Sequence, residues 1–196
     1  MTEEFISIQD RIISASIDII SDAGLDSLNY KNIALKTNIS EDMLYKYYYD
    51  TNEILIDIVK TYFKFDKSII KTISAKNVSS VEKIGFFMDA FCSYYSSYYS
   101  LSAIMLQYEE LLHNTHTREL VESGLLNRRT VLVSLFEDAI KNKEITNVYT
   151  ADQLADQLLG FVRVCFLNRR VMIYKRSIKD DIMSNYKIWI NNLKVI

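Results

Sequence analysis

The sequence predicts an all-α protein, and three observations lead to this prediction. The 196 residues contain no proline and only four glycines, whereas ordinary usage would give roughly 10 prolines and 14 glycines. Because these residues form most tight turns, their scarcity argues against sandwiches, barrels and propellers. Hydrophobic residues make up 49% of the chain and charged residues 24%, which supports a buried core and excludes global disorder. Apolar residues also recur at helical spacing in about nine segments.

The first predicted helix covers residues 8–23 and has one apolar face. It ends at Gly24, because glycine readily takes the left-handed conformation that terminates a helix. The residues of this face are Ile8, Ile12, Ala15, Ile19 and Ala23.

Two short helices are predicted next, at 30–37 and 41–47. Asn29 and Ser40 are well placed to cap them. Asn38 stands where the connecting turn passes through the left-handed region, which asparagine tolerates better than most residues. Two helices of about two turns joined in this way have the dimensions of a helix-turn-helix.

The remaining helices are predicted mainly from capping pairs. Asp50 with Glu53 opens a long helix at 51–75, and comparable pairs begin three of the later helices. Those pairs are Ser79 with Glu82, Thr150 with Gln153, and Ser177 with Asp180. The later helices are predicted at 79–99, 101–113, 116–142, 150–172 and 177–194.

Composition restricts the classes of function. A net charge of −2 and a pI near 5.8 describe an ordinary protein without a basic excess. Neither a signal peptide nor a membrane-spanning stretch is recognisable, and Cys92 and Cys165 lack metal-like spacing. We therefore expect a cytoplasmic protein with reduced thiols and no membrane partner.

No catalytic constellation is present in the sequence. There is no P-loop, GxGxxG or HExxH motif and no nucleophile–base–orienter set. His113 and His116 lie three residues apart, but without a third ligand they favour a solvated or capping role over a metal site. We therefore expect no enzymatic activity, no cofactor and no metal.

The segment 28–48 resembles the helix-turn-helix of TetR-type (tetracycline-repressor-like, AcrR-like) transcriptional regulators. The residues that carry the resemblance are Ile33-Ala34, Ile39-Ser40, Leu44-Tyr45 and Tyr48. The resemblance implies a DNA-binding domain at 1–50, followed by a connecting helix and a ligand-binding and dimerisation domain at 51–196. It covers about 50 residues closely, and the rest only in helix number and length.

The resemblance also implies which side chains face DNA. The proposed contacts are Tyr30, Lys31, Glu41, Asp42, Met43, Tyr45, Lys46 and Tyr47. Tyrosines and lysines suit phosphate contacts, which set register, and the spacing of Tyr48 points it inward. A homodimer would present two such heads to a palindromic operator in double-stranded DNA.

The charge of the head leaves an alternative open. Residues 1–64 carry a net charge of −5 and residues 65–196 a net charge of +3, whereas a DNA-binding head is normally basic. Glu41 and Asp42 suit DNA only where they accept a hydrogen bond from a base amino group. The leading hypothesis is a ligand-responsive repressor. The alternative is a TetR-like helical module for a small molecule or protein, with weak or lost DNA binding.

An aromatic segment at 86–108 is the candidate effector site. Aromatic bodies with phenol groups suit a small apolar or aromatic ligand, although packing in the core is the favoured explanation for any single one of these residues. The candidate lining residues are Phe87, Phe91, Tyr94, Tyr95, Tyr98, Met105 and Tyr108.

The last two helices are the candidate dimer interface. Residues 158–167 are apolar on nearly all sides, and such a helix must bury more than one face. The resemblance implies pairing with a second subunit in a four-helix arrangement. The candidate interface residues are Leu158, Gly160, Phe161, Arg163, Tyr186, Trp189 and Leu193.

Overall fold

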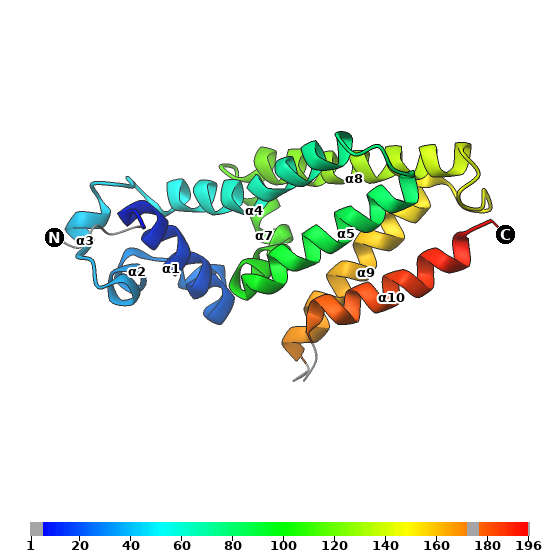
Figure 1. The fold of residues 1–196 in the computed structure, drawn as a ribbon. Helices are drawn as coiled ribbons and strands as arrows, with labels where there is room; N and C mark the ends of the chain where they lie inside the picture. The colour runs from blue at the N-terminus through cyan, green and yellow to red at the C-terminus, as the bar shows by residue number, and fades with distance from the viewer. Residues whose placement is uncertain (1–5, 172–176, 196) are drawn as a thin grey trace. The chain divides into compact units, whose positions relative to one another are not determined.

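The computed structural model describes residues 6–171 and 177–195. This described part contains ten α-helices, two 3-10 helices and no β-strand (Figure 1), which confirms the all-α prediction. The chain forms two compact units. Unit 1 comprises Met1–Phe63 and Tyr99–Glu122, and unit 2 comprises Lys64–Tyr98 and Ser123–Ile196.

Unit 1 is built around the first helix, α1. This helix contacts α2, η1, η2 and α6. It begins at the Ser7 hydroxyl, which accepts a hydrogen bond from the Asp10 backbone N–H, and ends at Gly24 with φ 83°, as predicted. The elements of unit 1 are α1 (Ile8–Ala23), η1 (Leu25–Ser27), α2 (Tyr30–Thr37), α3 (Glu41–Leu44), the first part of α4 (Thr51–Ser74), η2 (Tyr99–Ser102), α6 (Ala103–Leu106), α7 (Tyr108–His113) and the start of α8 (Arg118–Lys141).

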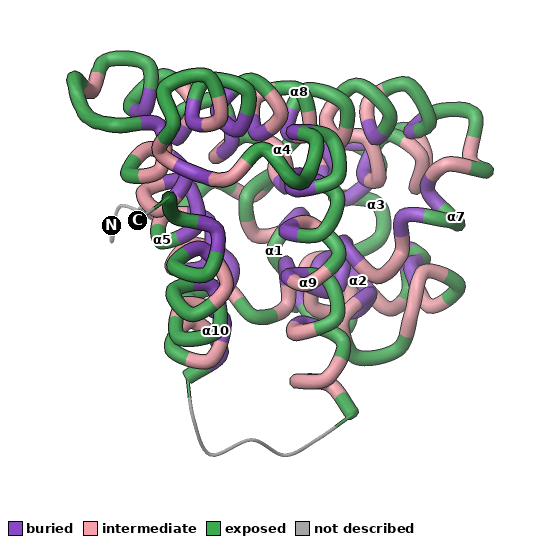
Figure 2. Tube along the Cα trace, turned by 90° about the vertical axis from the view of Figure 1, so that its right-hand side faces the viewer, coloured by how far each residue is buried: buried purple, intermediate pink, exposed green. Residues whose placement is uncertain are grey.

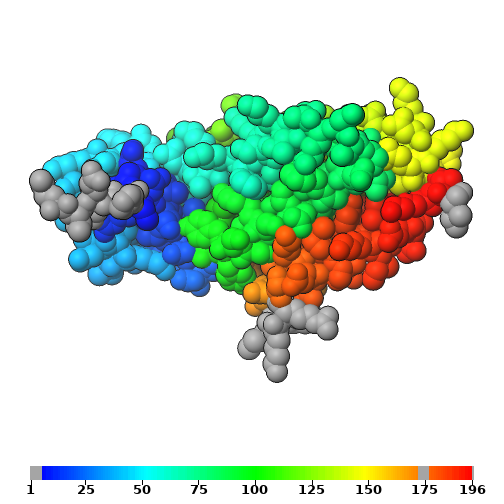
Figure 3. Space-filling model, viewed as in Figure 1, coloured from blue at the N-terminus to red at the C-terminus, as the bar shows by residue number. Residues whose placement is uncertain are grey.

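Unit 2 contains three helices beside the later parts of α4 and α8. These are α5 (Ser80–Ser97), α9 (Ala151–Val171) and α10 (Ile178–Leu193). Helix α10 packs against both α5 and α9. Figure 2 shows buried residues alternating with exposed ones along α10, and Figure 3 shows α10 at the surface of this unit beside α5.

Two of the predicted capping boxes are confirmed. Ser79 and Glu82 exchange both bonds at the start of α5. At the start of α9, the Thr150 N–H donates to Gln153 Oε1 at 2.9 Å, and the Gln153 N–H donates to Thr150 Oγ1 at 3.2 Å. Both helices begin within one residue of the predicted position, since a reciprocal cap satisfies two backbone donors at once.

The other two capping predictions need correction. The Asp50 carboxylate accepts from the backbone N–H groups of Asn52 and Glu53, but Glu53 reaches back to the Tyr49 N–H and not to that of Asp50. The Ser177 side chain makes no capping bond, although α10 begins at the next residue. A sequence pattern fixes where a cap can form, whereas the rotamer decides whether it does.

The predicted helix at 101–113 is wrong as a single element. The segment consists of η2, α6 and α7, with a break at Gln107, whose N–H donates to Ile104 O three residues back. The apolar period survives this break, so periodicity alone could not locate it. The predicted helix at 41–47 is also shorter, because residues 45–47 form a turn after α3.

Candidate functional site

The helix-turn-helix forms with the predicted caps. Asn29 Oδ1 accepts from the Asn32 N–H at 2.9 Å, and Ser40 Oγ accepts from the Met43 N–H at 3.3 Å. Asn38 has φ 56° and ψ 37°, so it occupies the left-handed region as predicted. Asparagine thus supports here a turn for which glycine is the usual choice.

A small core fixes the two helices of this motif. Ile33 and Leu44 are fully buried, and Tyr48 is 4% exposed, which confirms that Tyr48 points inward. The Tyr48 hydroxyl donates to Asp57 Oδ2 on α4 at 3.2 Å. Burial, with the nearby Asp57 carboxylate, raises the pKa of Tyr48 well above its ordinary value. The Arg11 guanidinium on α1 donates to Thr37 O at 3.0 Å, so α1 and α4 both hold the motif in place.

Most of the side chains predicted to face DNA are accessible. Met43 is half-buried, and the exposed residues of the set are Lys31, Glu41, Asp42, Tyr45, Lys46 and Tyr47. Lys36 is held by Asp22 at 3.1 Å, whereas Lys31 and Lys46 have no ion-pair partner among the described residues. These two lysines are therefore available for phosphates.

Tyr30 is placed differently from the expectation. Its side chain is 8% exposed, and its hydroxyl donates to the Tyr48 carbonyl oxygen at 2.6 Å. The ring stacks on Tyr45, with centroids 4.3 Å apart and planes 15° apart. The Tyr30 hydroxyl therefore lies inside the motif, and the Tyr30 ring supports the exposed ring of Tyr45.

Sequence reasoning missed one residue beside this surface. The Tyr49 side chain is 84% exposed. Its backbone N–H donates a hydrogen bond to the Glu53 carboxylate at the start of α4. The signal was its place next to Tyr48, because a residue adjacent to an inward side chain in a turn points elsewhere.

The aromatic set predicted for an effector divides between the two units. Phe87, Phe91 and Tyr95 are buried in unit 2 on α5. Tyr94 on the same helix and Tyr98, which follows its end, are half-buried. Met105 and Tyr108 are buried in unit 1. There the Tyr108 hydroxyl shares a hydrogen bond with the Tyr62 hydroxyl.

Two buried charged residues in unit 2 were not predicted. Asp66 on α4 and Arg128 on α8 are each 3% exposed, and Arg128 Nε donates to Asp66 Oδ2 at 2.9 Å. Burial raises the pKa of Asp66, and the Arg128 guanidinium opposes that rise. They lie 62 residues apart, and no local pattern connects them.

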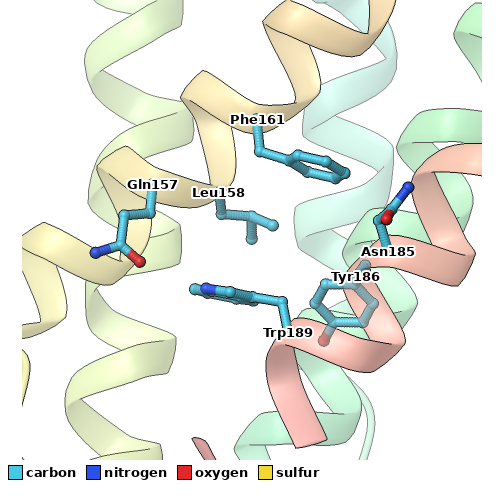
Figure 4. A pocket seen from close by; sticks show the side chains of 6 residues that line it. All are labelled: Gln157, Leu158, Phe161, Asn185, Tyr186 and Trp189. Atoms are coloured by element: carbon cyan, nitrogen blue, oxygen red, sulfur yellow. The ribbon is translucent and has the colours of Figure 1, made fainter. Parts of the chain in front are cut away.

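A small pocket lies between α9 and α10, with a volume of about 100 Å³. Figure 4 shows Leu158, Phe161 and Trp189 directed toward this space. The full lining is Gln157, Leu158, Phe161, Asn185, Tyr186 and Trp189. Four of the predicted interface residues thus meet at one place.

The other predicted interface residues are placed more variably. Gly160 and Arg163 are exposed, whereas Leu193 is buried within the subunit. A Cβ atom added at Gly160 would meet no atom beyond the adjoining turns of its own helix within 4 Å. Four apolar side chains outside the predicted interface set are also exposed on these two helices, namely Val164, Leu167 and Val171 on α9 and Ile188 on α10.

The histidines and cysteines take ordinary positions. His113 and His116 are exposed, and His113 Nε2 lies 3.8 Å from the Glu109 carboxylate. Burial raises the pKa of the Cys92 thiol to about 12. Among the described residues, no group of three His, Cys, Asp or Glu side chains could hold a metal ion, and no helix is long and apolar enough to cross a membrane.

Comparison of the sequence finds no matching protein-family model and no match among curated proteins. Comparison of the structure finds close similarity to several solved transcriptional regulators. The ketosteroid regulator KstR2 of Mycobacterium tuberculosis has a TM-score of 0.86 at 11% identity, over 97% of this chain and 96% of the other. The TetR-family regulator PfmR of Thermus thermophilus has a TM-score of 0.79 at 13% identity, over 93% of this chain and 98% of the other.

A third similar structure is AibR, solved in complex with isovaleryl coenzyme A and operator DNA. Its TM-score is 0.77 at 15% identity, over 95% of this chain and 97% of the other. At these identities the similarity establishes the fold. The chain has the fold of TetR-family transcriptional regulators along nearly its whole length.

Proposed function

We propose that the protein is a ligand-responsive, sequence-specific DNA-binding transcriptional regulator that acts in the cytoplasm as a homodimeric repressor. The observation that carries the proposal is the helix-turn-helix at α2–α3. Its inward residues are buried and bonded to α1 and α4, while six of the eight side chains assigned to DNA are exposed. A rigid support with a polar outward surface is what base and phosphate contacts require.

The contacts divide by chemistry. Lys31, Lys46 and the hydroxyls of Tyr45 and Tyr47 are phosphate partners, which set the register. Glu41 and Asp42 stand at the start of the recognition helix and accept hydrogen bonds from base amino groups, such as that of cytosine. Because carboxylates repel phosphate, this head gains selectivity for its operator at the expense of general affinity for DNA.

Dimerisation uses the face of α9 and α10. One short recognition helix reads few bases, whereas two heads of a homodimer read a palindrome. The exposed apolar residues on α9 and α10 and the open space at Gly160 support this use. In this scheme residues 1–50 form the DNA-binding domain, and residues 51–196 provide the connecting helix, the effector site and the dimer interface.

The effector is a small apolar or aromatic molecule that binds among the aromatic residues of α5. It acts through α4, which continues from unit 1 into unit 2. The effector can shift DNA binding only by its preference for the conformation that does not fit the operator. AibR was solved with isovaleryl coenzyme A, so neutral molecules with a branched acyl group are one class to screen.

Selection of bound sequences from random DNA tests the proposal. We expect enrichment of a palindrome, and gel-shift titration should show that this sequence is bound at least about tenfold more tightly than random duplex, the lower end of what specific base contacts supply. Selection that enriches no sequence at low salt would contradict the proposal.

The net charge of −5 on residues 1–64 favours a second candidate function, a helical binding module of the same fold with weak or lost DNA binding. Alanine at Lys31, Tyr45, Lys46 and Tyr47 separates the two. DNA affinity should collapse under the first function, whereas under the second there is no specific affinity to lose. Lys141→Ala on the exposed end of α8 is the matched control.

A further inference from the structure

The buried pair of Asp66 and Arg128 is the feature of unit 2 that packing explains least well. Arg128 Nη2 lies 2.8 Å from Asp66 Oδ2, and Arg128 Nε donates to the same oxygen at 2.9 Å. Burying two charges costs more desolvation free energy than the pair commonly recovers, so such a pair is weak evidence of a stabilising role. An apolar pair of similar volume would serve the core at least as well.

One oxygen of the Asp66 carboxylate accepts no hydrogen bond from the described part of the chain. Asp66 Oδ1 is buried and has no hydrogen-bond partner among the described residues, while the Nε and Nη2 donors of Arg128 converge on Oδ2. A buried acceptor without a donor is destabilising, because it has lost its water without replacing it. The molecule therefore carries a strong acceptor in its interior that a donor from outside could satisfy.

Aromatic side chains contact Arg128 and adjoin Asp66 in the chain. The Arg128 guanidinium lies over the Phe91 ring, 4.7 Å from its centroid, and donates to the Tyr95 hydroxyl at 3.3 Å. Phe65, next to Asp66 in the chain, stacks on Tyr94 with centroids 4.2 Å apart. Helices α4, α5 and α8 therefore bring one charged pair into a cluster of aromatic rings.

We propose that Asp66 and Arg128 are the recognition point of the effector site. The ligand is a neutral molecule with an apolar or aromatic body and one O–H or N–H group, which donates to Asp66 Oδ1. This inference rests on the proposed function, because it gives the effector of that regulator a chemical class. The two charges of the pair cancel, so a charged ligand group would bring an uncompensated charge into the interior, which is costly. Hence the donor is neutral.

The stacked rings of Phe65 and Tyr94 provide the route of entry. Both side chains are half-buried, and each adjoins a member of the buried cluster in the chain. In this proposal, Tyr94 moves away from Phe65 to admit the ligand toward Asp66. Since Asp66 and Phe65 are part of α4, a ligand bound there acts directly on the helix that follows the helix-turn-helix.

Pairs of probes in which a methyl ether replaces the O–H donor test the inference. Octan-1-ol is compared with methyl octyl ether, and 2-naphthol with 2-methoxynaphthalene, by calorimetric titration of the full chain. Because a hydrogen bond to a charged acceptor in a buried site is strong, we expect each alcohol or phenol to bind about tenfold or more tightly than its ether.

The decisive variant is the double substitution Asp66→Leu with Arg128→Met, which replaces the pair by apolar side chains of similar size. It should fold at least as stably as the unchanged chain and should bind alcohol and ether equally. Asp66→Asn is the second variant, and it should reduce the preference several-fold because a neutral acceptor is weaker. Arg129→Gln, which changes the neighbouring arginine in its exposed pair with Asp156, should keep the full preference.

Three results would overturn the inference. They are equal binding of the two members of each pair to the unchanged chain, no binding of any probe at millimolar concentration, and a preference that persists in the double variant. DNA binding is measured separately by sequence selection. If an operator is selected but the probes show no donor preference, this inference is wrong and the proposed regulator stands. If the probes show a donor preference but no operator is selected, the proposed regulator is wrong and the ligand site stands.

Discussion

Asn38 and Lys143 are the two residues other than glycine with positive φ among the described residues, at 56° and 57°. The sequence predicted the first, because asparagine between two short helices is a known left-handed residue. It did not predict the second, since lysine has no such preference. The bonds that hold Lys143 in this conformation, from Lys143 N to Ile140 O and from Glu144 N to Ala139 O, appear only once α8 has formed.

Lys143→Gly should therefore stabilise the protein by about 0.5–1 kcal/mol, because glycine adopts positive φ without a steric penalty. Thermal or urea unfolding measures the change. Glu137→Gly is the control and should destabilise by a similar amount, since Glu137 is exposed inside α8 and glycine is a poor helix former. A loss of stability in Lys143→Gly would contradict the account.

Tyr30 shows why the predicted DNA contacts were only partly right in placement. Its position at the start of α2 fitted an outward hydroxyl, but the bond to the Tyr48 carbonyl, 18 residues away, turns it inward. A tertiary acceptor of this kind leaves no local pattern in the sequence. Lys31, Tyr45 and Lys46 needed no such partner, and they lie exposed as expected.

A pair of tyrosine variants separates support from DNA contact. Tyr30→Phe leaves the Tyr48 carbonyl without its donor and should cost about 1–2 kcal/mol of stability, with DNA affinity unchanged at a temperature where the variant is folded. Tyr47→Phe should do the reverse, weakening binding severalfold without destabilising the fold. Unfolding curves and gel-shift titrations give both quantities. Equal losses of DNA affinity in the two variants would show that Tyr30 contacts DNA.

At the scale of elements, the sequence predicted helix positions well wherever a cap forms. The starts of α2, α5 and α9 follow from the capping hydrogen bonds of Asn29, Ser79 and Thr150. These bonds join residues three positions apart, so the sequence pattern predicts them. The division of residues 99–113 into three short helices was not predicted. No capping side-chain bond marks the start of α6 or α7, so their limits depend on tertiary packing.

The capping box of α5 should give the protein a measurable pH dependence. Hydrogen bonds from the Ser79 side chain and backbone lower the pKa of Glu82 below its ordinary 4.5. A lowered folded-state pKa means that the ionised carboxylate stabilises the fold above pH 4.5, and that this contribution is lost as the pH falls through the folded-state pKa. Ser79→Ala should therefore be less stable than the unchanged chain at about pH 7, by a margin that shrinks toward about pH 3.

Urea unfolding at the two pH values measures this margin. The matched control is Ser177→Ala at the start of α10, which removes a hydroxyl that makes no capping bond and should change stability little at either pH. A margin for Ser79→Ala that stays constant with pH would show that Glu82 takes no part.

For the whole molecule, two features that no local sequence pattern predicts join distant residues. Asp66 and Arg128 meet across 62 positions, and the pocket between α9 and α10 combines residues 157–161 with 185–189. Periodicity and caps describe single helices, whereas these sites depend on which helices become neighbours. The fold class was nonetheless predictable, because it is the sum of the single helices.

Gly160 tests the assembly of the whole molecule. A Cβ atom at this position meets no atom beyond the adjoining turns of its own helix within 4 Å, so Gly160→Ala should preserve the fold and even favour the helix by about 1 kcal/mol. Gly160→Trp should also fold but should shift the mass measured by sedimentation from dimer to monomer, because it fills the space that the proposed interface assigns to a second subunit. A dimer that withstands Gly160→Trp would place the interface elsewhere.

The central claim is that this acidic head reads DNA, and the affinity for a selected palindrome at varied salt tests it most directly. Two heads offer Lys31 and Lys46 twice over, so about four phosphates are neutralised, and the logarithm of affinity should fall with the logarithm of salt concentration with a slope of about −4. The account predicts this modest slope together with tight, sequence-selective binding that Lys46→Ala weakens. Binding to the selected sequence no tighter than to random duplex at low salt would contradict it.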